Sequence, residues 1–208
     1  MIIDHTGIVL FPDLLIFRMI GRFGSPIFAY TTAIGYIHTH DVLQYLKRLL
    51  IFALVSQIPY SLSINPSNLN IGFTLFFSVL TLSLYHAKSL LIRYAGTFVC
   101  ICIFLFIPMD YGLSFLIMIL GFYLYIKYHN LLYVIISYPL VLLAIYVSYG
   151  ASVTALQSLY VGGICAIWLL QDCNISDGRI YSFWNKFSYA VYPVHLLILF
   201  FFSLLIKN

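Results

Sequence analysis

Polar side chains are rare in this chain, and the first that could do chemistry are the neighbours Asp4 and His5. A carboxylate beside an imidazole can pair with a basic side chain or assist proton transfer. An aspartate that accepts the imidazole N–H also fixes the tautomer of the ring and raises its basicity. Neighbouring residues on a helix point about 100° apart, so these two need not bond each other. Two hypotheses remain: a proton-transfer pair, or a pair that only anchors the segment at a membrane interface.

Arg18 and Arg22 form the second polar group. Their i, i+4 spacing places both guanidinium groups on one face of a helix. This pattern favours an anion site or a salt bridge to Asp4 or Asp13. The alternative is simple anchoring at lipid headgroups.

The third group is His195, which follows Pro193 in an apolar run near the end of the chain. A proline inside a helix frees the backbone carbonyl four residues earlier, here that of Tyr189, and loosens the helix locally. A histidine at such a place predicts a functional site, because ionisable groups are costly inside a membrane. The alternative is a buried neutral histidine with one hydrogen bond.

The remaining polar residues favour ordinary roles. We expect interhelical amide hydrogen bonds from Gln57 and from Asn70 on the opposite side of a hairpin. Four histidines at predicted cytoplasmic helix ends are expected to make interfacial contacts and to assist an anionic cofactor: His38, His40, His86 and His129. Their spacing does not predict a metal site. Cys100, Cys102 and Cys165 stand in apolar runs, where a thiol usually packs as a small hydrophobic group.

Composition decides what surrounds these groups. Of 208 residues, 63% are hydrophobic and 8% are charged, with a net charge of +4 and no glutamate. A soluble domain carries about a quarter charged residues, and a chain of this size has too little interior to hide so much apolar surface. We therefore predict one integral membrane domain over residues 1–208, with the lipid bilayer as a partner. The modest charge excludes a nucleic-acid-binding surface.

Uncharged runs and the turn residues inside them place the membrane spans. They predict an all-α, polytopic transmembrane helix bundle of eight helices, each of about 20 residues. The predicted spans are one at 21–37, two within 49–87 separated at 64–70, two within 94–126 separated at Pro108 and Asp110, two within 128–171 separated at 148–150, and one at 187–206. Residues 1–11 are apolar but too short to cross alone, which predicts a re-entrant segment or a truncated first helix.

Basic residues in the intervening loops predict the orientation. Seven of them fall in the loops 38–48, 86–93, 127–130 and 172–186, against three in the alternate set. These seven are Lys47, Arg48, Lys88, Arg93, Lys127, Arg179 and Lys186. The first set of loops is therefore assigned to the cytoplasm, and the protein to a bacterial cytoplasmic (inner) membrane as a multi-pass protein.

Several segments together resemble the TraX family, with the match dense over about residues 4–90 and 185–200. The segments that carry the resemblance are Asp4-His5-Thr6-Gly7, residues 20–30, His38-Thr39, residues 45–54 with Ser56-Gln57-Ile58-Pro59, residues 70–75, and Tyr192-Pro193-Val194-His195-Leu196-Leu197. Members usually carry most of an apolar helix before the Asp-His pair, whereas only Met1-Ile2-Ile3 precede it here. We expect a later start than in the family, or a truncated chain.

The resemblance implies a membrane acyltransferase, distantly similar to multi-span acyltransferases that use acyl-CoA. It implies acetyl-CoA as the donor, no metal, and an amine or hydroxyl acceptor, which is the amino terminus of pilin for the namesake of the family; another cell-envelope acceptor is possible. Acyl transfer needs a base and a group that holds the oxyanion. Asp4 with His5 would supply the base and Arg22 the cation, while His195 lines the pocket or relays a proton.

Lys47 and Arg48 would hold the phosphates of coenzyme A.

Two other classes of function remain open. A small-molecule permease or flippase would use the same polar groups along a path, although such proteins usually contain repeated halves, and none is evident here. A non-catalytic accessory of conjugation is the other alternative.

Overall fold

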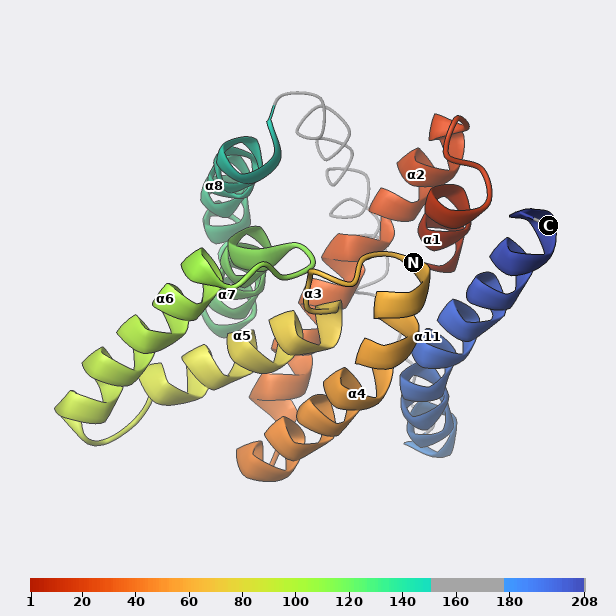
Figure 1. Cartoon of the computed structure of the whole chain (residues 1–208). Helices are drawn as coiled ribbons and strands as arrows, with labels where there is room; N and C mark the ends of the chain where they lie inside the picture. Colours follow the sequence, from red (N-terminus) through yellow and green to blue (C-terminus); the bar gives the residue numbers. More distant parts are fainter. Residues whose placement is uncertain (151–177, 208) are drawn as a thin grey trace. The chain divides into compact units, whose positions relative to one another are not determined.

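The computed structural model describes residues 1–150 and 178–207, and within these ranges every regular element is helical (Figure 1). The all-α prediction is therefore confirmed for the described residues. The helices divide into two compact units, each described by itself below. Unit 1 comprises Met1–Ile27, Val55–Pro66 and Leu159–Asn208, and unit 2 comprises Phe28–Leu54 and Ser67–Ser158.

Unit 1 is built around the first helix of the chain. Its elements are α1 (Ile2–Val9), α2 (Leu15–Arg22), the start of α3 (Gly24–His38), the second half of α4 (Val42–Ser63) and α11 (Gly178–Lys207). α1 packs against both α2 and α11. Gly7 and Gly21 permit the first of these contacts: a Cβ on Gly7 would lie 2.6 Å from Phe17 Cβ, and one on Gly21 would lie 2.8 Å from Asp4 Cα. The two helices can approach this closely only because neither position carries a side chain.

Unit 2 contains α5 (Ile71–Tyr85), a π-helical turn η1 (Ile92–Gly96) that leads into α6 (Thr97–Phe106), α7 (Gly112–Tyr128) and α8 (Leu132–Tyr149), with most of α3 and the first half of α4. α5 packs on α6 and α7, and α7 lies beside α8 (Figure 1). A glycine again allows the closest approach, since a Cβ on Gly121 would meet the Ser137 side chain. Phe115 and Ile119 of α7 are fully buried.

The two loops of unit 2 that precede α5 and α7 are joined by backbone hydrogen bonds. Leu69 N donates to Pro108 O at 3.0 Å, and Asp110 N donates to Leu69 O at 2.8 Å. The Thr74 hydroxyl adds a bond to Asp110 O at 2.7 Å. The helix breaks predicted at 64–70 and at Pro108 and Asp110 are both confirmed, because the helices end at Ser63 and Phe106.

Asn70 begins α5 and ties it to α4. Its Oδ1 accepts from Gly72 N at 2.7 Å, which caps the helix, and its Nδ2 donates to Ala53 O at 2.8 Å. The predicted interhelical amide bond is therefore present for Asn70. Gln57 Nε2 donates within its own helix to Ser61 Oγ at 3.0 Å.

Among the described residues, α4 is the one helix that is both long and apolar enough to cross a membrane. The other helices at predicted spans include α3 and α5 with 15 residues and α7 with 17. The last span was predicted to begin near residue 187, but α11 begins at Gly178. Residues 179–186 are charged in part, yet they contain no proline or glycine that would interrupt a helix. The predicted span after residue 150, with Cys165, lies outside the described residues.

Candidate active site

The candidate active site in unit 1 begins with two buried neighbours on α1. Asp4 and His5 are each only 3% exposed. Adjacent positions on a helix point in different directions, and α1 packs on two different helices. Asp4 accordingly contacts α2, whereas His5 contacts α11.

His5 forms a hydrogen bond with His195. Nδ1 of His5 lies 2.8 Å from Nε2 of His195, and the two ring planes are nearly parallel, 4° apart, with centroids at 5.1 Å. Nδ1 of His195 lies 2.9 Å from the backbone carbonyl oxygen of Val191, one turn earlier in α11. The two imidazoles and this carbonyl therefore form a chain of three groups joined by two hydrogen bonds.

The carbonyl decides where the protons are. Because Val191 O can only accept, Nδ1 of His195 must carry the proton of that bond. The other nitrogen of a neutral His195, Nε2, is then an acceptor, so Nδ1 of His5 donates to it. It follows that Nε2 of a neutral His5 carries a lone pair. This nitrogen is the one in the pair that can accept a further proton.

Tyr192 packs against both imidazoles. Its ring meets His5 edge-on at 5.8 Å and 65°, and His195 at 5.4 Å and 67°. The phenol ring is buried. It therefore limits the rotation of both histidine rings and keeps the hydrogen bond between them aligned.

Asp4 forms ion pairs with both arginines of α2. Asp4 Oδ1 lies 3.8 Å from Arg18 Nε and 3.7 Å from Arg22 Nε. The Asp4 and Arg22 side chains are only 4% and 7% exposed, whereas that of Arg18 is 32% exposed. Of the two aspartates considered from the sequence, the arginines pair with Asp4. Two guanidinium groups around one carboxylate leave one net positive charge here.

The structure thus brings Asp4, His5, Arg22 and His195 together in unit 1. The hydrogen-bond partner of His5 is His195, so the orienting role considered for Asp4 from the sequence falls to His195. Sequence reasoning did not single out Val191, whose carbonyl sets the tautomers, or Gly21, whose missing side chain lets α2 reach Asp4. A glycine inside a helix between two arginines is a signal of close backbone approach that could have identified Gly21.

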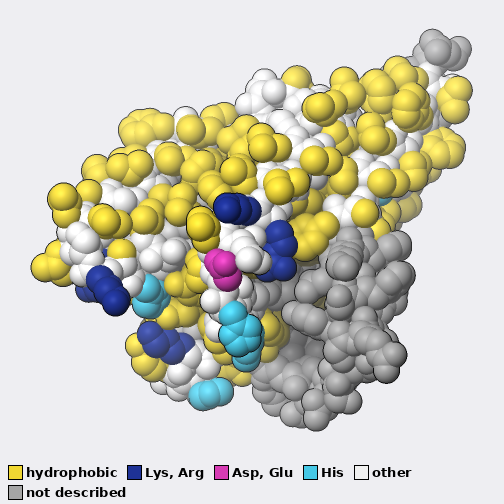
Figure 2. Space-filling model, turned by 90° about the horizontal axis from the view of Figure 1, so that it is seen from below, with side chains coloured by type: hydrophobic (Ala, Val, Ile, Leu, Met, Phe, Trp, Pro, Cys, Tyr) yellow, Lys and Arg dark blue, Asp and Glu magenta, His cyan; other side chains and the backbone are white. Residues whose placement is uncertain are grey.

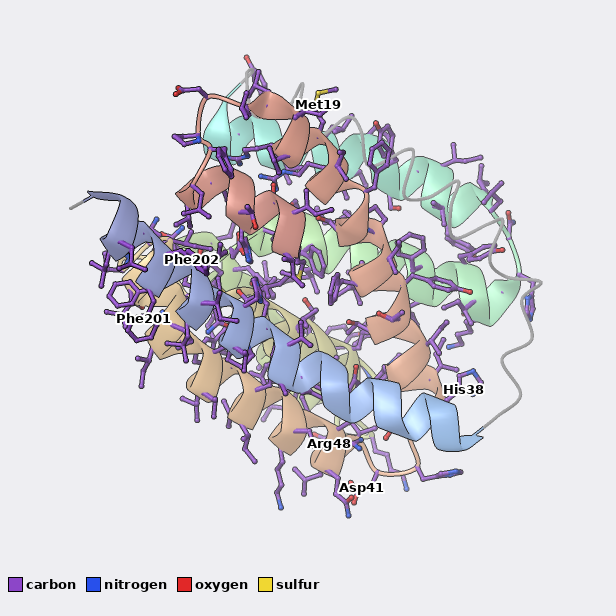
Figure 3. All side chains as sticks on the ribbon, turned by 90° about the vertical axis from the view of Figure 1, so that its right-hand side faces the viewer. Met19, His38, Asp41, Arg48, Phe201 and Phe202 are labelled. Atoms are coloured by element: carbon purple, nitrogen blue, oxygen red, sulfur yellow. The ribbon has the colours of Figure 1, made fainter. Side chains whose placement is uncertain are left out.

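Lys47 and Arg48 belong to unit 2, on α4. Both are exposed, and the Arg48 guanidinium lies 5.8 Å from the ring centroid of Tyr45. His38 ends α3 and Asp41 precedes α4, near the same end of α4 as Arg48 (Figure 3). Among the described residues, no group of three or more His, Cys, Asp or Glu side chains could hold a metal ion.

Comparison with known proteins identifies one family. The family model described as TraX protein matches residues 1–203. No curated protein and no solved structure gives a match. The family match includes α1, α2 and the part of α11 that carries His195. Because it covers almost the whole chain, the protein belongs to the TraX family, which is membrane-associated and related to conjugation.

Proposed function

We propose that this protein is a membrane-embedded acyltransferase that moves an acetyl group from acetyl-CoA to an amine or hydroxyl acceptor. The observation that carries the proposal is the hydrogen-bonded pair of His5 and His195, which leaves a lone pair on Nε2 of His5. An oriented imidazole of this kind is the commonest general base in enzymes. In the family namesake the acceptor is the amino terminus of pilin, and we extend that class of acceptor, an exposed amine or hydroxyl, to this chain.

Embedding in the bilayer as a multi-pass protein of a bacterial cytoplasmic membrane is supported by the surfaces of the helices. Hydrophobic side chains cover much of the face shown in Figure 2. α11 exposes Phe201 and Phe202 (Figure 3), and the outer face of α4 exposes Ile51, Leu54, Val55, Ile58 and Leu62. Soluble proteins rarely expose contiguous apolar surface on this scale.

α2 supports the same proposal, because its apolar side chains are exposed and one of its charged side chains is buried. It exposes Leu15, Ile16, Met19 and Ile20 while its Arg22 is buried against α1. In water the opposite arrangement would be more stable, because apolar surface is costly to expose and a charge is costly to bury. In lipid the outward apolar face is favourable, and the arginines gain from their carboxylate partner.

His5 supplies the base in the proposed reaction. Acetyl-CoA, when bound, would supply the acetyl group as a thioester. Nε2 of His5 takes the proton of the acceptor amine or hydroxyl while the acceptor lone pair forms the bond to the carbonyl carbon. The C–S bond then breaks, and the imidazolium returns the proton to the departing thiolate. His195 holds His5 in the required tautomer throughout.

Arg22, Lys47 and Arg48 would supply positive charge in the proposed reaction. Arg22 would stabilise the negative charge that develops on the carbonyl oxygen, a contribution that is often the largest single term in acyl transfer. Arg18 and Arg22 together outweigh Asp4, so a positive charge remains for this purpose. Lys47 and Arg48 of α4 would bind the phosphates of coenzyme A, because their exposed basic side chains are accessible to a soluble donor.

The experiment that tests this function measures thioester cleavage. Purified protein in nanodiscs is incubated with acetyl-CoA and a panel of amine and hydroxyl acceptors, and release of the free thiol is followed with acetylation of the acceptor. We expect His5→Ala to lower the rate by at least about 100-fold. The control is Thr31→Ala, which removes an exposed polar side chain of unit 2 that has no role in the proposed reaction and should leave the rate unchanged. Full activity in a correctly folded His5→Ala protein, or substrate counterflow without thioester cleavage, would contradict the proposal.

A further inference from the structure

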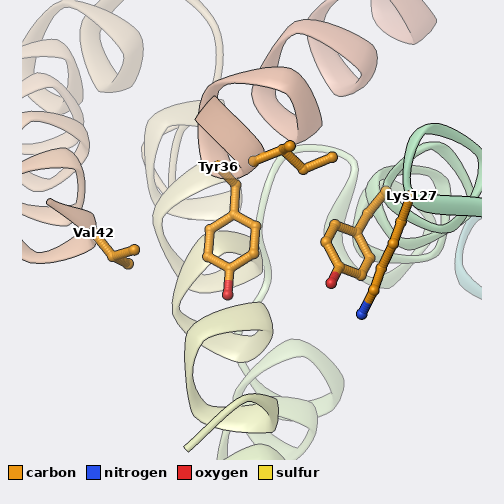
Figure 4. Close-up of a pocket in the computed structure, with 5 residues that line it drawn as sticks. Tyr36, Val42 and Lys127 are labelled. Carbon is orange, nitrogen blue, oxygen red and sulfur yellow. The ribbon is translucent and has the colours of Figure 1, made fainter. Parts of the chain in front are cut away.

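A second polar site lies wholly within unit 2. An open pocket of about 340 Å³ is lined by residues of three helices: Tyr36 and Ile37 near the end of α3, Val42 at the start of α4, and Tyr123 and Lys127 near the end of α7 (Figure 4). Two of these residues are aliphatic, two are aromatic and one is cationic. The pocket thus has an apolar wall, an aromatic wall and a single positive charge.

The aromatic wall is held in place by His86. Nδ1 of His86 lies 2.8 Å from the carbonyl oxygen of Leu82, which can only accept, so this nitrogen carries a proton. Nε2 of neutral His86 is then the acceptor, and the Tyr123 hydroxyl donates to it at 2.9 Å. The Tyr36 hydroxyl donates to the same Leu82 carbonyl at 3.3 Å. The Tyr36 and Tyr123 rings meet edge-on at 5.8 Å, so both phenols are fixed before any ligand binds.

Lys127 supplies the charge of the pocket. Its Nζ lies 5.5 Å from the ring centroid of Tyr123 and 5.4 Å from that of Tyr128, and the side chain is exposed. It forms no ion pair with a carboxylate in the part of the chain that the structure describes. The chain segments 38–48, 86–93 and 127–130 carry four further basic residues, Lys47, Arg48, Lys88 and Arg93, and one acid, Asp41. These three segments, two of which contribute Val42 and Lys127 to the pocket, therefore carry a net positive charge.

These features select a ligand class. A cationic ligand is disfavoured, because Lys127 already occupies the cation position over the aromatic rings. An anion attached to an apolar or planar group satisfies both parts of the pocket: the ammonium binds the anion as a point charge, and the rest packs on Tyr36, Ile37 and Val42. The volume is at the lower end of the range for ligand pockets, about 300–1,000 Å³, which suits a headgroup or one end of a larger molecule.

We propose that the pocket formed by Tyr36, Ile37, Val42, Tyr123 and Lys127 binds a phosphate ester whose attached group packs against the tyrosine rings. The phosphate would contact the Lys127 ammonium, and the attached group would pack against the aromatic wall formed by Tyr36 and Tyr123. Such an ester can be the headgroup of an anionic phospholipid or the phosphate end of a soluble molecule. This site is separate from the His5–His195 pair and does not depend on acyl transfer.

The test measures binding to the full-length chain in nanodiscs with two probes. Labelled adenosine diphosphate represents a soluble phosphate ester on a planar ring, and phosphatidylglycerol, added to phosphatidylcholine nanodiscs and counted by native mass spectrometry, represents the lipid. We expect K127Q to weaken binding of one probe by about 10-fold, because the charge-assisted hydrogen bond to the phosphate is lost. K127R should retain most of the binding. If K127Q weakens binding of adenosine diphosphate alone, the ligand is a soluble phosphate ester. If it weakens binding of phosphatidylglycerol alone, the ligand is a lipid.

The matched control is K88Q, which removes the same charge from an exposed lysine that does not line the pocket. Binding that falls equally in K88Q and K127Q, or that is unchanged for both probes in K127Q, would overturn the proposal. Tyr36→Phe retains the ring and should bind nearly as well as the unmodified protein, whereas Tyr36→Ala should bind more weakly. His5→Ala should bind both probes normally, which separates this test from the test of acyl transfer.

Discussion

Nε2 of His195 lies 2.8 Å from Nδ1 of His5, although 190 positions separate the two residues in the sequence. The contact exists because α1 packs on α11. Its direction is set by the Val191 carbonyl, which holds the proton of His195 on Nδ1. His195 is therefore a positioning residue in the proposed reaction, and His5 is the group that exchanges a proton with the acceptor.

Replacement of His195 should reduce turnover through loss of the correct tautomer of His5. We expect His195→Leu, which cannot accept a hydrogen bond, to lower kcat by about 100-fold with a smaller change in KM. His195→Gln retains an acceptor oxygen and should recover part of this loss. The measurement is the kcat and KM for acetyl-CoA, together with the pH dependence of kcat/KM for each variant.

The pH profile separates positioning from a merely structural role. If His195 orients His5, its removal alters the pH at which the rate falls on acidification, because the imidazolium form of His5 loses its acceptor. If His195 only packs, both variants should lose activity in proportion to their loss of folded protein, with the profile unmoved. That second result would remove His195 from the proposed mechanism.

Asp4→Asn should destabilise unit 1 because two arginines lose their carboxylate. Removal of one partner of a buried ion pair costs about 3–5 kcal/mol. The long N–O distances of 3.7 and 3.8 Å and the partial exposure of Arg18 reduce this to about 2 kcal/mol here. Thermal unfolding in detergent, followed by tryptophan fluorescence, measures the change.

A second substitution identifies the source of that loss. In the double variant Asp4→Asn/Arg22→Gln the uncompensated buried charge is gone, so the double variant should be less destabilised than the sum of the two single variants. The expected coupling is about 1 kcal/mol. Strict additivity would indicate that Asp4 and Arg22 do not interact energetically.

The helical class and the helix breaks could be predicted because they depend on local features. Prolines and asparagines interrupt the apolar runs at 64–70 and at Pro108, and the structure has turns at both places. The start of α11 at Gly178 could not be predicted from charge, since basic residues mark a loop for topology without breaking a helix. The charge pattern predicts a loop before residue 187, whereas the helix propensity of the same residues permits a helix, and the structure has the helix.

The members of the candidate site were identifiable from the sequence, and a salt bridge between the arginines and Asp4 was among the predicted alternatives. The pairing of His5 with His195 was not identifiable. Asp4 and His5 are adjacent, and this suggested that one could orient the other. On a helix, adjacency instead directs the two side chains to different neighbours, so Asp4 meets Arg22 and His5 meets His195. Which helix lies on each side of α1 depends on tertiary packing, and no local pattern in the sequence records it.

Gly21 should be intolerant of a side chain, in contrast to Gly24. A Cβ at position 21 would overlap Asp4 Cβ and lie 2.8 Å from Asp4 Cα, so α2 would have to move away from α1. Overpacking of this kind costs about 1–3 kcal/mol, which exceeds the gain of up to about 1 kcal/mol in helix propensity. We expect Gly21→Ala to lower both thermal stability and acetyl transfer, because Arg22 moves with α2.

Gly24→Ala is the matched control for this substitution. Its Cβ would meet only Met1 N, at 3.6 Å, which is an ordinary contact. This variant should be as stable as the unmodified protein or slightly more stable. Equal stability of Gly21→Ala and Gly24→Ala would show that α1 and α2 are not in contact at Asp4.

Asn70 should contribute more to stability than any other helix cap of known geometry in the described chain. It is fully buried, and its amide satisfies both the Gly72 N–H and the Ala53 carbonyl. Asn70→Ala leaves both of these buried groups without that partner, at about 1–3 kcal/mol for each unsatisfied group. Asn130→Ala removes a comparable side-chain bond just before α8, the one from Leu132 N at 2.9 Å, but at an exposed position where water replaces the side chain. It should cost about 0.5–1 kcal/mol.

Denaturation of the two variants in parallel measures this difference. The burial of Asn70, and not capping alone, is the reason why Asn70→Ala should lose more stability than Asn130→Ala. Asn70→Asp offers a further comparison. The carboxylate can still accept from Gly72 N but cannot donate to Ala53 O, and it places a charge at a fully buried position. Asn70→Asp should therefore be no more stable than Asn70→Ala at neutral pH. A stability close to that of the unmodified protein would mean that the bond to Ala53 contributes little and that α4 and α5 are held together by their apolar contacts.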